Sequence, residues 1–152
     1  MKKIYVLIFI TALMFTVGCK LDEPVVPASL QNAQLLGKWN LSAVEVTTQT
    51  GIDVPSDPVS VTSFTDQDYF EFKEGNAATF SSSFYGKVYT GYYAINSAAI
   101  PQTLTFKSGD FTVKYFVDRI SANSIVLVEI TTGLQDGETT TTINRYTYNK
   151  AV

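Results

Sequence analysis

The stretch YFEFKEGNAATFSSSFYGKVYTGYYAIN, residues 69–96, decides the fold of this chain. Apolar and aromatic residues alternate with polar ones along it, and Gly75 and Gly86 lie in its two short polar interruptions. A period of two places successive side chains on opposite faces of a strand, and interruptions this short permit only antiparallel hairpins. The stretch therefore predicts three antiparallel strands joined by two tight turns.

The same alternation continues on both sides of this stretch, in segments rich in Thr, Val, Tyr, Phe and Ile, which favour strands. We expect strands near residues 38–47, 68–74, 77–85, 87–96, 102–107, 111–118, 124–132 and 139–149. Closing such a sheet removes the edges that would otherwise invite aggregation. The prediction is an all-β fold, an antiparallel up-and-down eight-stranded β-barrel, with a β-sandwich as the alternative. Residues 48–67, rich in Asp, Pro and Ser, are expected to form a large loop.

The N-terminus has the layout of a secretory signal. Lys2 and Lys3 precede an uncharged apolar run, residues 4–17, which ends at Gly18-Cys19. As a helix this run would be about 21 Å long, well short of the roughly 30 Å hydrocarbon core of a bilayer. We therefore expect residues 1–18 to be a signal peptide and not a membrane span.

Residues 16–19, TVGC, resemble the lipobox of bacterial lipoproteins, in which the cysteine carries a diacylglycerol. Cys19 is the only cysteine of the chain, so it has no disulfide partner within the chain. We expect lipidation at Cys19, where a diacylglycerol and a further acyl chain such as palmitate would form a durable anchor. Residues 19–34 are then a lipidated tether that ends in a short helical turn.

The residues after the cysteine bear on location. Lys20, not aspartate, follows it, so the enterobacterial-type signal for inner-membrane retention is absent. Asp22-Glu23 resembles the acidic surface-export signal of Bacteroidetes lipoproteins. We expect a lipid-anchored protein of the outer membrane, on its periplasmic face or at the cell surface, whose membrane partner is reached only through the acyl chains.

A family resemblance covers residues 35–149. Residues 35–41, LLGKWNL, resemble the Gly-x-Trp opening of lipocalins and of the lipocalin-like domains common in Bacteroidetes lipoproteins. The order of the later segments agrees with it: YFEFKEG at 69–75, ATF at 78–80, GYYAI at 91–95, LTF at 104–106 and RYTY at 145–148. The resemblance implies a lipocalin-like barrel domain over residues 35–152.

In lipocalins the tryptophan of the first strand plugs one end of the barrel, and a late arginine lies across its ring. The resemblance thus assigns barrel closure to Trp39 and Arg145, which would form a cation–π contact. Strict alternation places Tyr146 and Tyr148 on the face opposite Arg145. Arg145 would therefore need a bulge or a path around the barrel end, and a solvated arginine is the alternative.

An inward Trp39 sets Leu41 and Ala43 inward as well. The phase of the later strands predicts interior positions for Phe70, Phe72, Phe80, Phe84, Tyr93, Ile95, Leu104 and Phe106. These side chains would either line a pocket for a small hydrophobic molecule or fill the core. Tyr89 and Tyr92 are expected on the outside, where they could stack on sugars or dock a protein partner.

Catalysis is not expected. The chain has no histidine and its one thiol is assigned to the lipid, so we expect neither an enzyme nor a cofactor or a His or Cys metal site. Calcium at Asp53, Asp57, Asp66 and Asp68 is the alternative considered for the acidic loop.

The function classes left open are a carrier and an accessory module. Nine basic residues of the eleven remain once Lys2 and Lys3 leave with the signal, against fourteen acidic ones, a formal charge of −5. Such a surface does not suit nucleic acid. The chain is therefore expected to hold a small hydrophobic ligand in the barrel, or to bind an envelope protein through the surface of a filled barrel.

Overall fold

The computed structural model describes residues 33–152. The predicted signal peptide, Cys19 and most of the tether lie outside the described residues. Within residues 33–152, no helix is long and apolar enough to cross a membrane.

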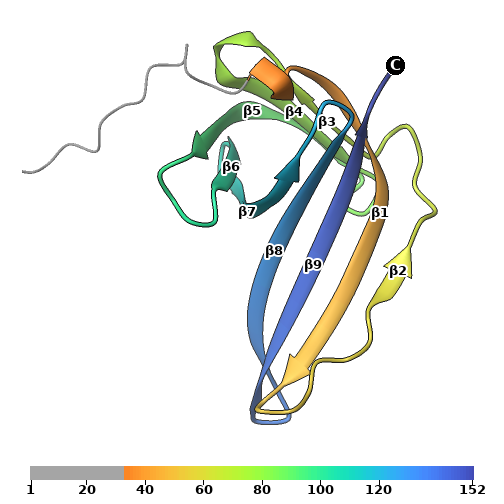
Figure 1. Ribbon diagram of the computed structural model, residues 1–152, viewed down its shortest axis with the longest axis vertical. Coiled ribbons are helices and arrows are strands. Elements are labelled where there is room, and N and C mark those ends of the chain that lie inside the picture. Colours follow the sequence, from red (N-terminus) through yellow and green to blue (C-terminus); the bar gives the residue numbers. More distant parts are fainter. Residues whose placement is uncertain (1–32) are drawn as a thin grey trace, which may run out of the picture.

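The described chain is a succession of antiparallel strands (Figure 1). Its elements are η2 (Ala33–Leu35), β1 (Gly37–Thr50), β2 (Val59–Val61), β3 (Tyr69–Phe72), η3 (Glu74–Asn76), β4 (Ala77–Ser82), β5 (Lys87–Asn96), β6 (Thr103–Ser108), β7 (Phe111–Ile120), β8 (Ser124–Gln135) and β9 (Glu138–Lys150). The strand order is β2-β1-β3-β4-β5-β6-β7-β8-β9, and β1 also pairs with β9. Eight strands thus close an antiparallel barrel, with β2 as an extra strand, so the predicted fold is confirmed and the sandwich is excluded.

The strands differ in length. β1, β8 and β9 extend well beyond the others as a ribbon, with β2 beside β1 (Figure 1). The expectation of a large loop over residues 48–67 was wrong at the start of that range and in its middle. β1 runs on to Thr50, which pairs with Thr140, and Val59–Val61 adds a short strand to β1.

One end of the barrel, which we call the closed end, is sealed by Trp39. The indole is fully buried, and its Nε1 donates a 2.6 Å hydrogen bond to the carbonyl oxygen of Leu35 in η2. Lys150 lies directly across from Trp39 in the β1–β9 pairing, and its Nζ is 5.1 Å from the centroid of the ring. The cation on the indole is therefore a lysine.

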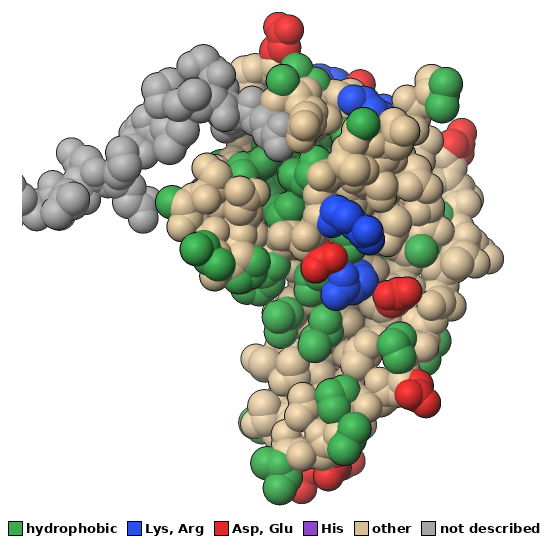
Figure 2. Space-filling view, viewed as in Figure 1, with side chains coloured by type: hydrophobic (Ala, Val, Ile, Leu, Met, Phe, Trp, Pro, Cys, Tyr) green, Lys and Arg blue, Asp and Glu red, His purple; other side chains and the backbone are tan. Residues whose placement is uncertain are grey.

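Arg145 lies elsewhere, so its expected role in closure was wrong. It faces Glu45 across the β1–β9 pairing, on the outer surface, and its Nη1 donates a 2.7 Å bond to Asp118 Oδ2. Figure 2 shows charged side chains of both signs gathered midway along this face. The physical reason is parity: Tyr146 and Tyr148 point inward, so Arg145, which directly precedes Tyr146, points outward.

A bulge in β1 overturns a second expectation. The register with β9 shifts between Leu41 and Ala43, so that Leu41 faces the buried Tyr148 while Ala43 faces Thr147. Directly opposed residues share a face of the sheet, and an extra residue reverses the alternation. Ala43 therefore points outward and not inward, and Val44, opposite Tyr146, takes the inward position.

The core is built around the ring of Phe70. Five other rings have centroids within 6.1 Å of it: Phe72, Phe80, Phe106, Tyr115 and Tyr148. All six side chains are buried, and several pairs meet edge to face, the arrangement that the ring quadrupoles favour. The barrel between the closed end and its middle is thus filled with aromatic side chains.

Replacing Trp39 by Phe should destabilise the barrel. The change leaves the Leu35 carbonyl without its donor and creates a cavity, which together should lower the free energy of unfolding by about 2–4 kcal/mol. Arg145→Ala removes only exposed ion pairs and should lower it by less than about 1 kcal/mol. Urea unfolding followed by far-UV circular dichroism measures both, and equal losses would contradict the assigned roles.

Candidate ligand-binding site

The other end of the barrel, the open end, is formed by the β4–β5 and β6–β7 turns. Tyr85, Tyr89 and Phe111 meet there, and we call them the aromatic wall. The rings of Tyr89 and Phe111 stack with centroids 4.0 Å apart and planes at 13°, and Tyr85 meets Phe111 edge-on at 5.7 Å. Tyr89 and Phe111 are half-buried and Tyr85 is exposed. The filled core therefore continues into an aromatic surface that solvent can reach.

Three phenols from β7 and β9, the strands on either side of β8, lie near Tyr85 of this wall, and we call them the phenol cluster: Tyr115, Tyr146 and Tyr148. The hydroxyl of Tyr146 donates a 2.9 Å hydrogen bond to Glu129 Oε2, and the rings of Tyr115 and Tyr146 are 5.6 Å apart at 77°. Glu129 and Tyr146 come from the inner faces of β8 and β9, because each continues the inward phase set by Leu127 and Tyr148. One carboxylate thus faces the interior beside several phenols.

Two hydroxyls of this cluster can donate a hydrogen bond to a ligand. The side chains of Tyr115 and Tyr148 are buried, and neither hydroxyl forms a hydrogen bond with another residue of the described range 33–152. Within that range Asn40 Oδ1 is the one fully buried side-chain atom without a partner, so both hydroxyl oxygens keep some exposed surface and can donate to a group from outside the chain.

The electrostatics keep these phenols neutral. Burial raises the pKa of Tyr115, Tyr146 and Tyr148, and the carboxylate of Glu129 raises each pKa further. Burial also raises the pKa of Tyr85, again with a contribution from Glu129. The site therefore offers neutral hydroxyl donors and one carboxylate acceptor against aromatic rings. Small-ligand sites have this composition, apolar walls with a few convergent polar groups.

The structure separates the residues that the sequence assigned to ligand lining. Phe70, Phe72, Phe80, Tyr93, Leu104 and Phe106 are buried in the core, and Ile95 is half-buried against it. Phe84 was placed wrongly: it is 88% exposed, because β4 ends at Ser82 and Phe84 falls in the turn. Tyr89 was also placed wrongly, since it faces Phe80 on the inside, whereas Tyr92 is 69% exposed.

Sequence reasoning missed Tyr85, Tyr115 and Glu129. Tyr115 had a signal, because Val113 and Tyr115 share one phase of the 111–118 alternation. No signal in the sequence indicated Glu129, because a carboxylate within an apolar strand is not expected to face the interior. Tyr85 joins the site through the turn that carries it.

Asp68, considered for calcium, has a structural role. Its carboxylate accepts bonds from the backbone N and Oγ of Ser83 at 2.6 and 2.8 Å, and from the backbone N of Thr65 at 3.1 Å. Burial works to raise the pKa of Asp68, but these hydrogen bonds outweigh it and hold the pKa below its usual range. Among residues 33–152, no group of three or more acidic, His or Cys side chains could hold a metal ion.

Comparison of the chain with protein-family models, with curated proteins and with solved structures gave no match. The class that the fold defines is an antiparallel β-barrel with a buried aromatic core, consistent with a lipocalin-like barrel. The function is therefore argued from the residues of the site.

Alkaline titration should show a late phase of tyrosine ionisation. The phenol cluster should ionise well above pH 10, the ordinary value for a tyrosine. Because a raised folded pKa favours the neutral phenol, its contribution to stability is complete below the unfolded pKa and is lost as pH rises above it. Ultraviolet absorbance should show the late phase coinciding with unfolding, and Tyr146→Phe should reduce its amplitude. A single transition near pH 10 in a folded protein would contradict the assigned burial.

Proposed function

We propose that the chain is a lipid-anchored lipoprotein of a bacterial envelope, whose lipocalin-like domain binds a small hydrophobic molecule at the open end of the barrel. The observation that carries the proposal is the pair of hydroxyls on the buried side chains Tyr115 and Tyr148, which have no hydrogen-bond partner in the described chain and lie near enough to Tyr85 of the aromatic wall to interact with it electrostatically. A ligand with an apolar ring and an acceptor group would cover the wall and accept from these hydroxyls.

The filled core limits the depth of binding. Phe70 and the rings around it occupy the barrel interior, so a ligand would enter only as far as the phenol cluster. The site would hold one ring-sized group with the rest of the molecule lying towards the ribbon of β1, β8 and β9. Its role is binding without catalysis, since the site combines neutral phenols with one carboxylate already bonded to Tyr146.

The anchor rests on the sequence. The lipobox-like residues 16–19 and the single cysteine support lipidation at Cys19, and Lys20 with Asp22-Glu23 supports the outer membrane, on its periplasmic face or at the cell surface. A binding domain held there by acyl chains would sequester or hand over its ligand beside the membrane.

A second candidate is an accessory module that binds an envelope protein through its surface. The packed core favours it, together with a groove of about 340 Å³ on the outer face, lined by side chains that include Phe116, Val128 and Ile130. The two candidates differ in whether the open end or the outer face is occupied.

Ligand binding should depend on the open end. Anilinonaphthalene sulfonate combines aromatic rings with an acceptor group, so its fluorescence should rise on binding to the detergent-free mature domain, residues 33–152, which contains the whole closed barrel. Tyr85→Ala and Tyr148→Phe should each weaken binding about tenfold, which corresponds to about 1.4 kcal/mol. Tyr92→Ala, on the exposed outer face, should change nothing.

Equal binding by all variants would contradict the site. Native mass spectrometry of the same domain produced in its own host gives an independent reading. A retained small molecule, lost in the Tyr148→Phe protein, would support the carrier, whereas no retained molecule and no dye binding would favour the accessory module.

Cys19→Ser should release the protein from the membrane. Without the thiol no thioether to diacylglycerol forms, so labelled palmitate should not be incorporated and the protein should leave the membrane fraction. Ser29→Ala, in the same tether, is the matched control and should remain lipidated. Membrane retention with label in the Cys19→Ser chain would contradict the assignment.

A further inference from the structure

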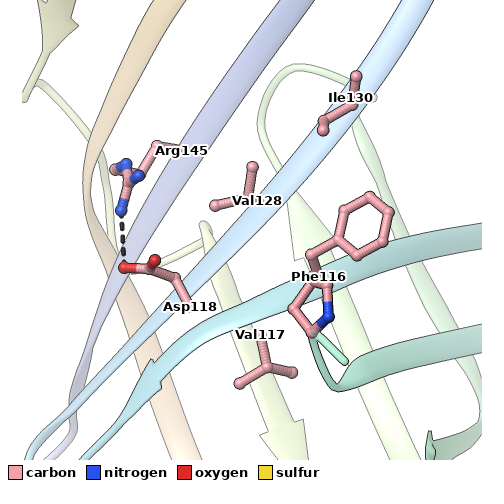
Figure 3. Close-up of a pocket in the computed structure, with 7 residues that line it drawn as sticks. Phe116, Val117, Asp118, Val128, Ile130 and Arg145 are labelled. Atoms are coloured by element: carbon pink, nitrogen blue, oxygen red, sulfur yellow. Dashed lines mark hydrogen bonds and ion pairs between the residues drawn. The ribbon is translucent and has the colours of Figure 1, made fainter. Parts of the chain in front are cut away.

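Half of strand β8 has a free edge. β8 pairs with β9 along its whole length, from Ser124 to Gln135, but with β7 only through Ile125–Val128. Beyond Val128 the two strands diverge, as Figure 3 shows, and within the described chain no backbone hydrogen bond reaches the edge of residues 129–135 on that side. Seven residues of edge are thus open to another strand.

The other long edge of the ribbon is protected. β2 covers β1 at Val44–Val46, and beyond β2 the loop residue Ser56 bonds to Thr48 through both its backbone N and its Oγ. This loop also carries Pro55 and Pro58, residues that prevent a further strand from pairing. The free edge of β8 has neither proline nor lysine. The edge of β1 is therefore blocked against pairing with a further strand, whereas the edge of β8 is free to pair.

We propose that the free edge of β8 pairs antiparallel with the same edge of a second copy of this chain, about a two-fold axis at Thr132. Thr132 is the midpoint of residues 129–135, so pairing over the full edge must be centred there. The register sets Ile130 opposite Leu134 and Glu129 opposite Gln135, so apolar side chains meet and no like charges oppose one another. An edge that complements itself in this way is what a two-fold dimer requires.

Exposed apolar side chains on the outer face of β8 also favour a second copy of the chain as the partner. Ile130 and Leu134 lie on this face, 48% and 79% exposed, and the pairing covers both in each copy. Ile130 also lines the outer groove, next to Val128 and Phe116 (Figure 3). Leu134 of the second copy, placed opposite Ile130, comes to the side of the groove and supplies an apolar side chain to it.

A cysteine at the axis tests the register. Thr132→Cys in the full chain, in a Cys19→Ala background and purified in detergent, should form a disulfide-linked dimer on air oxidation. Opposed residues of an antiparallel pair have Cα atoms about 4.5–5.5 Å apart, which is within disulfide range. Thr141→Cys in the same background is the matched control, because Thr141 pairs with Thr132 on β9, one strand away from the edge, and it should not cross-link. No cross-link at Thr132, or equal cross-linking of both variants, would overturn the proposal.

Sedimentation measures the association without a cross-link. The full chain with its native β8, in density-matched detergent, should sediment as a dimer, and Leu134→Lys should raise the dimer Kd at least tenfold. Thr139→Lys adds the same charge at the cross-strand neighbour of Leu134, away from the edge, and should leave the dimer intact. A monomer whose edge amides are protected from hydrogen exchange would assign the edge to residues 20–32 of the same chain and overturn the dimer. Because Leu134 is remote from the phenol cluster, dye binding to the Leu134→Lys chain separates a failure of this proposal from a failure of the ligand site.

Discussion

The pairing of β1 with β9 is the constraint on which the structure depends. It joins the first and last strands of the barrel over eleven opposed residue pairs, and without it the sheet would have two open edges. The same pairing sets Lys150 opposite Trp39 and Tyr148 opposite Leu41, so the seal of the closed end and one of the phenols are both consequences of its register. The closure of the barrel and the composition of its interior therefore both follow from this one register.

The alternation of residues predicted the strands well where one face is apolar and the other polar. It predicted β9 almost in full but ended β1 at residue 47 and β8 at residue 132, short of Thr50 and Gln135. The end of β1 is rich in threonine on both faces, which leaves no contrast between an apolar and a polar face. The bulge in β1 was also hidden, because an extra residue in a strand reverses the facing of every later side chain without changing the pattern of letters. The bulge misplaced Ala43, and the end of β4 at Ser82 misplaced Phe84. The cation at the indole was assigned to Arg145, because neither strand alone shows that the register sets Lys150 opposite Trp39.

The ligand site could be anticipated only in its composition. An interior lined with Phe and Tyr followed from the strand phase, but the convergence of Tyr85, Tyr115, Tyr146 and Glu129 requires three strands and a turn to meet at one end. The alternation of residues predicted the aromatic side chains of the core, because they recur every second residue along a strand. It could not predict the polar groups of the site, since the role of Glu129 depends on the phenols that face it from other strands.

Both ends of the described chain lie at the closed end, where Ala151 N bonds to Lys38 O and η2 packs beneath Trp39 (Figure 1). Joining the two ends and opening the chain at another turn would therefore leave the order of strands around the barrel unchanged. A circular permutant that joins Val152 to Ala33 by a short linker and begins at Gly137, in the distal turn of the ribbon, would keep every strand neighbour of the native protein. In such a molecule a chain attached to the N-terminus would leave the barrel from the opposite pole, while the interior of the barrel would stay unchanged.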